Sequence, residues 1–201
     1  MQYYLIIFLF SALAYLIGSV STAIIICKLM GLQDPRTVGS NNPGATNVLR
    51  HGGKKAAFIT LLGDMLKGLI PVLLVMQFQN DSLTVALVGL CALLGHIFPL
   101  YYGFKGGKGV ATFYGVILGT NWLVGVIAIT IWLSVAFVFK ISSLSAMVSI
   151  FFTPFILWHF SHSVELTATV VLMSMLILWR HRSNIKSLMH GAEETIGQAK
   201  D

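Results

Sequence analysis

The sequence predicts an all-α integral membrane protein with seven transmembrane helices, one of them short, in a single domain over residues 1–201. Of the 201 residues, 56% are hydrophobic and only 10% are charged, whereas a soluble domain carries about 25% charged residues. The apolar residues come in long blocks, most of which suit a bilayer of ordinary thickness. The approximate bounds of these blocks are 3–26, 56–76, 83–102, 109–139, 144–160 and 164–180.

The first block is expected to be a retained transmembrane helix. No basic residue precedes residues 3–26, and no small-residue cleavage site follows them, so the block does not resemble a signal peptide. Cys27 and Cys91 lie in or beside apolar blocks and offer neither a disulfide framework nor a zinc site. The net charge of +6 is expected to come from basic residues that line cytoplasmic loops and attract anionic headgroups or substrates, and not to indicate binding of nucleic acid.

The block 109–139 is too long for one helix. At about 1.5 Å per residue it would extend about 46 Å, against a hydrocarbon core of about 30 Å. Gly119-Thr120-Asn121 is typical of a turn. We therefore predict a short helix near 109–119 and a full one near 121–139. A helix of half the usual length is expected to pack against protein rather than lipid.

The placement of the basic residues favours seven helices over six. With seven, twelve cations share one face, only Lys67 lies within a span, and the opposite face carries Asp81 and Glu165. With six, Lys140 and the C-terminal cations would lie opposite the other seven. The positive-inside rule then predicts an external N-terminus and a cytoplasmic C-terminus, with a short cytoplasmic tail at 187–201. The twelve cations are Lys28, Arg36, Arg50, Lys54, Lys55, Lys105, Lys108, Lys140, Arg180, Arg182, Lys186 and Lys200.

Three cytoplasmic segments carry the polar residues. The first, 31–55, holds five glycines and two prolines together with Arg36 and Arg50. Such a stretch supplies backbone N–H groups in tight turns and suits a phosphate cradle. The alternative is a plain connection, but at about 25 residues the segment exceeds the usual length of one.

The second segment is Gly106-Gly107-Lys108-Gly109, which opens directly onto a helix. This pattern places amide donors, a helix N-terminus and an ammonium around one anion. The spacing is not that of a Walker A motif, so no nucleotide site is expected. A basic snorkelling loop is the alternative, although it leaves three glycines in four positions unexplained.

The third segment, 179–186, leaves the last helix. His181 and Asn184 are three residues apart and share a helix face, and histidine is a proton carrier near neutral pH; basic residues that merely end a helix are the alternative. Ser143, in the connection before the helix at 144–160, could add a hydroxyl. Asp64 and Lys67 lie within a span, where they form either a functional site or an ion pair that orients the helix.

The chain resembles the bacterial acyl-phosphate:glycerol-3-phosphate acyltransferases along essentially its whole length. Three segments resemble the signature motifs of that family: DPRTVGSNNPGATNVLR, GHIFPLYYGFKGGKGVAT and RHRSNIKSLMHGAEE. The resemblance implies a multi-pass protein of the bacterial inner membrane with its active site facing the cytoplasm. The residues that match family site positions are Ser40, Asn42, Thr46, Arg50, Lys108, Ser143, His181 and Asn184.

The implied reaction transfers a fatty acyl group from acyl phosphate to the 1-hydroxyl of glycerol 3-phosphate. The products are lysophosphatidate and inorganic phosphate, in the first acylation of phospholipid synthesis, with no cofactor and no metal. Lys108 and the amides of 106–109 are expected to stabilise phosphate and oxyanion, while Arg50 and Ser40 hold a substrate phosphate. His181 is expected either to take the hydroxyl proton or to bind substrate, and Ser143 to take part in catalysis.

Two other classes compete with this interpretation. A transporter of organic phosphates would also use short helices with inward-pointing N-termini, but the spans show no inverted repeat. A metal-dependent phosphotransferase would need clustered acidic ligands that the sequence lacks. A G-x-S-x-G elbow is absent, so no acyl-serine is expected. The sequence sets neither the acyl-chain preference nor the oligomeric state, and it is compatible with a monomer.

Overall fold

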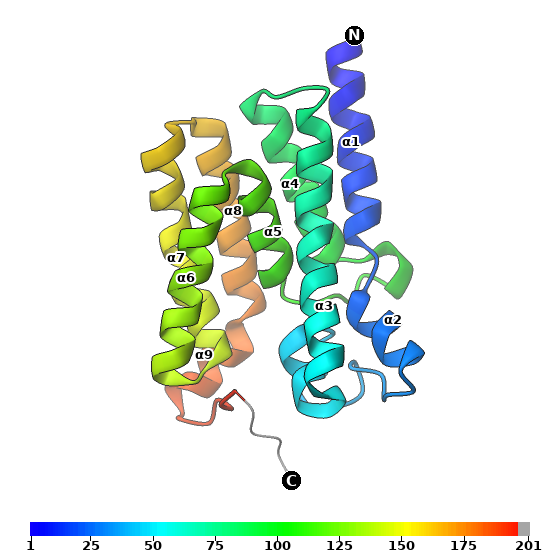
Figure 1. The fold of residues 1–201 in the computed structure, drawn as a ribbon, viewed down its shortest axis with the longest axis vertical. Coiled ribbons are helices and arrows are strands. Elements are labelled where there is room, and N and C mark those ends of the chain that lie inside the picture. The colour runs from blue at the N-terminus through cyan, green and yellow to red at the C-terminus, as the bar shows by residue number, and fades with distance from the viewer. Residues whose placement is uncertain (197–201) are drawn as a thin grey trace.

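The computed structural model describes residues 1–196 and shows a bundle of α-helices, with no strand in that range (Figure 1). Lys200 and the rest of the predicted tail beyond residue 196 lie outside the described residues. The elements are α1 (Gln2–Gly18), α2 (Thr22–Leu29), α3 (Ala45–Met76), α4 (Ser82–Ile97), η1 (Leu100–Tyr102), α5 (Val110–Thr120), α6 (Trp122–Phe139), α7 (Ser142–Ser161), α8 (Val164–Arg180) and α9 (Arg182–Met189).

Five helical segments among the described residues are long and apolar enough to cross a membrane. A sixth candidate is the pair α8 and α9, which is bent by 57°. At 11 residues, α5 is shorter than a span. The prediction of an all-helical, multi-span fold is therefore confirmed at the level of five or six candidate spans. The five segments are Gln2–Leu29, Ala45–Met76, Ser82–Tyr102, Trp122–Phe139 and Ser142–Ser161.

The first apolar block forms one candidate span, Gln2–Leu29, in agreement with the predicted transmembrane segment, but its helix is interrupted between α1 and α2. α1 ends at Gly18, which lies so close to α4 that an added methyl group would come within 2.2 Å of the Ala92 carbonyl oxygen. Ser21 is extended, and α2 begins only at Thr22. The carbonyl of Val20 accepts a hydrogen bond of 2.7 Å from Lys67 Nζ. In an unbroken helix that carbonyl would accept a backbone amide four residues later.

The first polar segment, 31–55, is more helical than predicted. α3 begins at Ala45 rather than near residue 56, and it is interrupted at Gly53, where φ is 82° and ψ is 174°. Residues with a side chain rarely adopt a positive φ, whereas glycine does so readily. Gly53 therefore kinks α3 between a short helical stretch that carries Thr46 and Arg50 and the long apolar stretch that follows.

The predicted division of the block 109–139 is confirmed. α5 ends at Thr120, and the side-chain oxygen of Asn121 caps α6 by accepting the amides of Leu123 and Val124 at 3.1 and 3.2 Å. Most of α5 is buried, as expected for a short helix that packs against protein. It touches α3 closely: a methyl group on Gly115 would lie 1.9 Å from the carbonyl oxygen of Met65.

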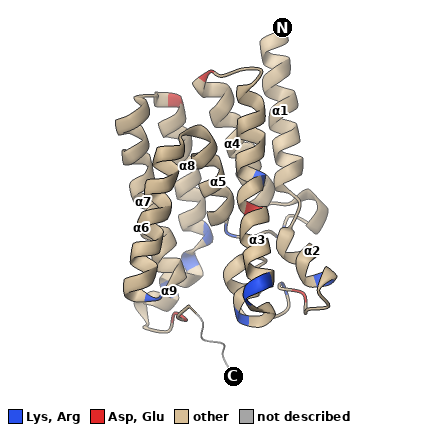
Figure 2. Ribbon diagram, in the orientation of Figure 1, with Lys and Arg blue, Asp and Glu red and all other residues tan. Residues whose placement is uncertain are grey.

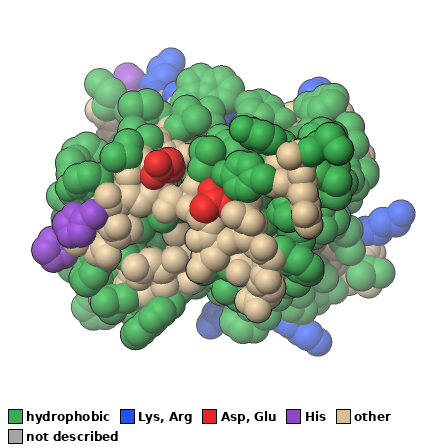
Figure 3. All heavy atoms as spheres, turned by 90° about the horizontal axis from the view of Figure 1, so that it is seen from above, with side chains coloured by type: hydrophobic (Ala, Val, Ile, Leu, Met, Phe, Trp, Pro, Cys, Tyr) green, Lys and Arg blue, Asp and Glu red, His purple; other side chains and the backbone are tan. Residues whose placement is uncertain are grey.

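Charge divides the bundle into two unlike ends. Figure 2 shows Lys and Arg gathered at the end opposite the N-terminus, apart from a charged stretch midway along α3. We call the end opposite the N-terminus the cation-rich end. Asp81, which caps α4, and Glu165, in the first turn of α8, belong to the opposite end. Figure 3 looks onto that opposite end, where acidic side chains lie in a polar centre surrounded by hydrophobic side chains.

Candidate active site

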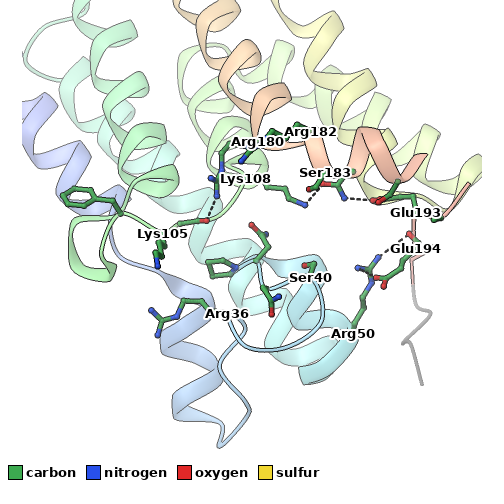
Figure 4. Close-up of a pocket in the computed structure, with 18 residues that line it drawn as sticks. Arg36, Ser40, Arg50, Lys105, Lys108, Arg180, Arg182, Ser183, Glu193 and Glu194 are labelled. Atoms are coloured by element: carbon green, nitrogen blue, oxygen red, sulfur yellow. Dashed lines mark hydrogen bonds and ion pairs between the residues drawn. The ribbon is translucent and has the colours of Figure 1, made fainter. Parts of the chain in front are cut away.

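A cavity of about 620 Å³ lies at the cation-rich end, where the three polar segments of the sequence meet (Figure 4). Ser40 and Arg50 reach it from the loop before α3 and from the start of α3. Lys108 reaches it from the loop before α5, and Arg180 from the end of α8. Figure 4 also shows Glu193 and Glu194 of the C-terminal segment beside these cations.

A second cavity, of about 260 Å³, adjoins the first and shares Ser40, Arg50 and Lys108 with it. Its remaining walls are largely apolar and come from α3, α5, α6 and α7. They include Leu61, Met65, Val110, Tyr114, Ile129, Trp132, Leu133 and Ala146. A cationic cavity continuous with an apolar one suits a ligand that joins an anion to an apolar chain.

The predicted site residues lie around these two cavities, with one exception. Those that line at least one cavity are Ser40, Asn42, Thr46, Arg50, Gly106, Lys108, Gly109, Ser143, His181 and Asn184. Gly107 instead packs behind the cavity wall, where an added methyl group would lie 2.2 Å from Nε2 of His96. His181 and Asn184 both line the second cavity, as their spacing predicts.

The glycine cradle, residues 106–109, is bonded to the end of α4. The amide of Gly106 donates to the carbonyl of Ile97 at 3.2 Å, and the amide of Gly107 donates to that of His96 at 3.3 Å. These carbonyls end a helix and need partners. Both amides are therefore engaged within the protein, which differs from their expected role toward an anion. Only the Lys108 ammonium and the N-terminus of α5 then face a bound anion from this segment.

Lys108 begins a chain of hydrogen bonds across the site. Its Nζ donates to Oδ1 of Asn184 at 2.6 Å, and Nδ2 of Asn184 donates to Glu193 Oε1 at 2.6 Å. Ser143 Oγ donates to the same carboxylate oxygen at 2.5 Å. Burial lowers the pKa of the Lys108 ammonium, and the Glu193 carboxylate partly offsets this effect. One network thus joins the cradle, α9, α7 and the C-terminal segment.

The C-terminal segment after α9 supplies two site residues that the sequence argument missed. Glu193 accepts the hydrogen bonds from Asn184 and Ser143. Glu194 forms an ion pair with Arg50, in which Glu194 Oε2 lies 2.5 Å from Arg50 Nη1. The amide of Ile196 donates to the carbonyl of Lys140 at 2.7 Å and so ties the segment to the start of α7. A signal was present in the sequence, because these adjacent acids end the third motif, RHRSNIKSLMHGAEE, in a chain with only seven acidic residues.

Asn47 organises the first motif, and the sequence argument also missed this residue. It is 2% exposed, and its Nδ2 donates to the carbonyls of Pro35, Val38 and Asn42 at 2.8 to 3.2 Å. Its Oδ1 accepts the amide of Ser40 at 3.1 Å. A single buried amide therefore shapes the turn that brings Ser40 to the cavity, since a buried polar group of this kind is stable only when it is fully bonded.

His181 lies buried at the turn between α8 and α9, with 3% exposure. Its Nδ1 is 2.8 Å from the carbonyl oxygen of Ile177, so Nδ1 carries the proton and donates, and Nε2 is the acceptor. Burial lowers the pKa of His181 from 6.5 to about 4, and the cations Lys108 and Arg180 act in the same direction. The imidazole is therefore neutral at neutral pH.

Metal ligation finds no support in the part of the chain that the structure describes. No group of three or more His, Cys, Asp or Glu side chains within residues 1–196 is placed to hold a metal ion. The carboxylates that line the first cavity, Glu193 and Glu194, are engaged with Ser143, Asn184 and Arg50.

Residues 8–191 match the glycerol-3-phosphate acyltransferase family. The glycerol-3-phosphate acyltransferase of Thioalkalivibrio sulfidiphilus is 54% identical over 184 residues, which cover 92% of this chain and 91% of that protein. That of Cupriavidus metallidurans is 49% identical over 197 residues, which cover 96% and 97%.

Two crystal structures of PlsY, an integral membrane glycerol 3-phosphate acyltransferase, share the fold. The glycerol 3-phosphate form has a TM-score of 0.91 and 36% identity, and the match covers 95% of this chain and 96% of that one. The lysophosphatidic acid form has a TM-score of 0.89 and 34% identity, with 95% of each chain covered. Fold and cavities thus belong to a membrane-embedded enzyme. The chain is a member of the glycerol-3-phosphate acyltransferase family, integral membrane acyltransferases of phospholipid synthesis.

The low pKa of His181 predicts a pH-dependent stability. Because its folded-state pKa of about 4 lies below the ordinary 6.5, the unfolded chain binds a proton that the folded protein does not bind between these values. His181 therefore contributes stability above about pH 6.5 that is lost as the pH falls toward 4. The unfolding temperature of the purified protein in detergent is expected to fall over this range, and to fall less in His181→Asn. Parallel curves for the two proteins would contradict the assignment.

Proposed function

We propose that the enzyme transfers a fatty acyl group from acyl phosphate to the 1-hydroxyl of glycerol 3-phosphate, releasing lysophosphatidate and inorganic phosphate. The observation that carries this proposal is the junction of the two cavities, where Lys108 and Arg50 line both the cationic and the apolar space. Lysophosphatidate joins a phosphate to one acyl chain and matches that junction. A relative with 34% identity has been solved in a lysophosphatidic acid form, which supports this product.

An acyl phosphate donor is supported by the number of cations around the first cavity. Both proposed substrates carry a phosphate, so the site must hold two anions at once. The cavity is lined by six basic side chains: Arg36, Arg50, Lys105, Lys108, Arg180 and Arg182. Acyl phosphate is already activated, with phosphate as its leaving group. Catalysis can therefore rest on orientation and charge stabilisation.

The tail carboxylates indicate where substrate oxygens would bind. Glu194 forms an ion pair with the guanidinium of Arg50, and Glu193 accepts hydrogen bonds from Asn184 and Ser143. A carboxylate and a phosphate present similar oxygen acceptors to such donors. We assign Arg50 and Ser40 to one substrate phosphate, with Asn42 and Thr46 lining the same space. Asn184 and Ser143 are assigned to the neighbouring substrate group.

In the proposed reaction, the glycerol hydroxyl oxygen attacks the carbonyl carbon of the acyl phosphate. A new C–O ester bond forms, the C–O bond to phosphate breaks, and inorganic phosphate leaves. Lys108 stabilises the negative charge that develops on the carbonyl oxygen and the leaving phosphate. We assign His181 to binding, because an imidazole with a pKa of about 4 is a weak base. Its Nε2 accepts a hydrogen bond from the hydroxyl of glycerol 3-phosphate that does not react, and a substrate phosphate takes the proton of the attacking 1-hydroxyl.

The proposal places the active site at the cytoplasmic side of the bacterial inner membrane, with seven spans in one domain and the tail at 187–201 inside. The gathering of Lys and Arg at the end that holds both cavities supports this orientation (Figure 2). Although α5 is short, it joins the cradle at the cation-rich end to α6 and so reverses the direction of the chain within the bundle. It therefore counts as a span for topology.

The donor is tested directly with purified enzyme in detergent and labelled glycerol 3-phosphate. Lysophosphatidate is expected with a long-chain acyl phosphate and not with the corresponding acyl-CoA, since acyl-CoA lacks the phosphate leaving group. Separation of the labelled lipid by thin-layer chromatography measures both rates. Equal rates with the two donors would contradict an acyl phosphate-specific site.

The role of Lys108 is tested by Lys108→Ala, which is expected to lower kcat/KM by about 100-fold or more, as for the loss of a transition-state donor. Lys54→Ala is the matched control, because Lys54 is an exposed cation on α3 that lines neither cavity. It is expected to retain nearly full activity. Equal losses in the two variants would favour a diffuse electrostatic role for the cations.

Topology is tested with single cysteines introduced as Lys140→Cys and Asp81→Cys after Cys27 and Cys91 have been replaced by alanine. Lys140 lies between α6 and α7, and Asp81 caps the start of α4. Seven spans place these positions on opposite sides of the membrane. A membrane-impermeant thiol reagent is therefore expected to label Asp81→Cys in intact cells and Lys140→Cys only after lysis. Labelling of both from outside would exclude the proposed arrangement.

A further inference from the structure

Three ionisable side chains lie buried together beside the cradle and have no role in the reaction above, although two of them, Asp64 and His96, also line the second cavity. Asp64 and Lys67 on α3 are 3% and 6% exposed, and His96 on α4 is 7% exposed. Asp64 and Lys67 belong to α3, which carries a charged stretch midway along its length, away from the other cations (Figure 2), and His96 lies in the last turn of α4. Ionisable groups inside a membrane protein are expensive to bury and commonly serve a function. We call this set the Asp64–Lys67–His96 cluster.

Lys67 is the centre of the cluster. Its Nζ lies 2.9 Å from Asp64 Oδ1, 2.7 Å from the carbonyl oxygen of Val20 and 3.1 Å from His96 Nδ1. The contact with Asp64 is an ion pair, and the other two are hydrogen bonds in which the ammonium can only donate, because it has no acceptor. His96 Nδ1 is therefore an acceptor, and the ring proton lies on Nε2. The Asp64 carboxylate balances the charge of Lys67, and the imidazole is neutral.

The opposite edge of His96 faces the cradle. A methyl group on Gly107 would lie 2.2 Å from Nε2 and 2.9 Å from Cε1, so the imidazole ring packs directly against the backbone of Gly107. The carbonyl of His96 also accepts the amide of Gly107 at 3.3 Å. Gly107 directly precedes Lys108. The direction in which Lys108 leaves the backbone therefore depends on where the His96 ring is held.

The same stretch of α3 fixes the chain on the other side of Lys108. The backbone carbonyl of Asp64 accepts a hydrogen bond of 2.9 Å from the hydroxyl of Thr112, in the first turn of α5. Gly68, one turn further along α3, lies so close to α5 that an added methyl group would come within 2.2 Å of the Thr112 carbonyl oxygen. The chain is thus anchored both before and after Lys108 by residues of the cluster.

We propose that the Asp64–Lys67–His96 cluster positions Lys108 for acyl transfer by holding the His96 ring against Gly107. In this proposal the residues of the cluster are positioning residues that act through the cradle. Asp64 and His96 also line the second cavity, and direct contact with substrate would instead give a loss of activity that does not depend on Lys108. This inference rests on the role proposed for Lys108. A role in folding alone would leave the geometry of Lys108 unaffected, and kinetic coupling separates the two explanations.

The variant His96→Asn tests the inference. Its amide oxygen can take the place of Nδ1 as an acceptor for Lys67, while the two ring atoms that face Gly107, Cε1 and Nε2, are removed. We expect kcat/KM for glycerol 3-phosphate to fall by about 10- to 100-fold, as for residues that orient a functional group. The fraction of folded, monodisperse protein in detergent is expected to stay close to that of the wild type.

A double-mutant cycle with Lys108→Ala provides the decisive comparison. If His96 acts by placing Lys108, then His96→Asn lowers kcat/KM less than threefold once Lys108 is alanine. An equal fold-loss in both backgrounds, or wild-type kinetics for His96→Asn, would overturn the inference. A Lys108→Ala enzyme with full activity would instead overturn the proposed role of Lys108. If His96→Asn does not fold, His96→Gln enters the same cycle with the same expected coupling.

The contact between His96 and Gly107 is tested separately by added methyl groups. Gly107→Ala is expected to lower activity in the wild-type background and to cause a much smaller loss beside His96→Asn, because the two nearest atoms are gone and the Pro43 carbonyl oxygen, at 3.2 Å, remains. Gly106→Ala is the matched control: its methyl group would meet the backbone carbonyl oxygen of His96 at 2.0 Å, which His96→Asn does not remove. An identical loss from Gly107→Ala in both backgrounds would contradict the proposed contact.

Discussion

The site depends on two hydrogen bonds that end α4. The carbonyls of His96 and Ile97 come at the end of an apolar helix, where no further turn supplies partners, and an unsatisfied carbonyl costs several kcal/mol in a nonpolar interior. The amides of Gly106 and Gly107 fill this need. Only glycine permits the approach, since a methyl group on Gly106 would lie 2.0 Å from the His96 carbonyl oxygen. The hydrogen bonds that satisfy the carbonyls at the end of α4 therefore also place Lys108 at the cavity.

Gathering cations at one point creates a second constraint, because the basic groups repel one another when no anion is present. Burial lowers the pKa of the Lys108 ammonium, and the nearby Arg180 and Arg50 lower it further, whereas the Glu193 carboxylate raises it. The C-terminal acids therefore belong to the electrostatics of the cavity. Substrate phosphates would engage the same donors, so the pairing of Arg50 with Glu194 is an interaction that a phosphate can replace.

Local signals in the sequence predicted much of this protein. Each of the correctly predicted features can be recognised from residues that are contiguous in the sequence. These features are the apolar blocks, the division at Asn121 and the segments that line the cavity. The missed features are set by distant partners. The break after Gly18 involves the ammonium of Lys67 on another helix, and the engagement of the Gly107 amide involves the end of α4. Periodicity and composition mark Lys67 and Gly107 as unusual, but they carry no information on which distant group each one contacts.

Comparison of Lys67 with Lys108 shows how one chain gives two lysines opposite roles on the two sides of Gly107. Lys67 is held inside the protein by an ion pair with a carboxylate and by hydrogen bonds to a carbonyl and an imidazole, so a ligand could engage it only by displacing these buried partners. Lys108 donates to the neutral amide of Asn184 and reaches the Glu193 carboxylate only through that amide. A neutral partner at the edge of a cavity is exchanged for a phosphate at far smaller cost than a buried carboxylate. The difference in partners, more than the difference in exposure, supports the positioning role proposed for Lys67 and the catalytic role proposed for Lys108.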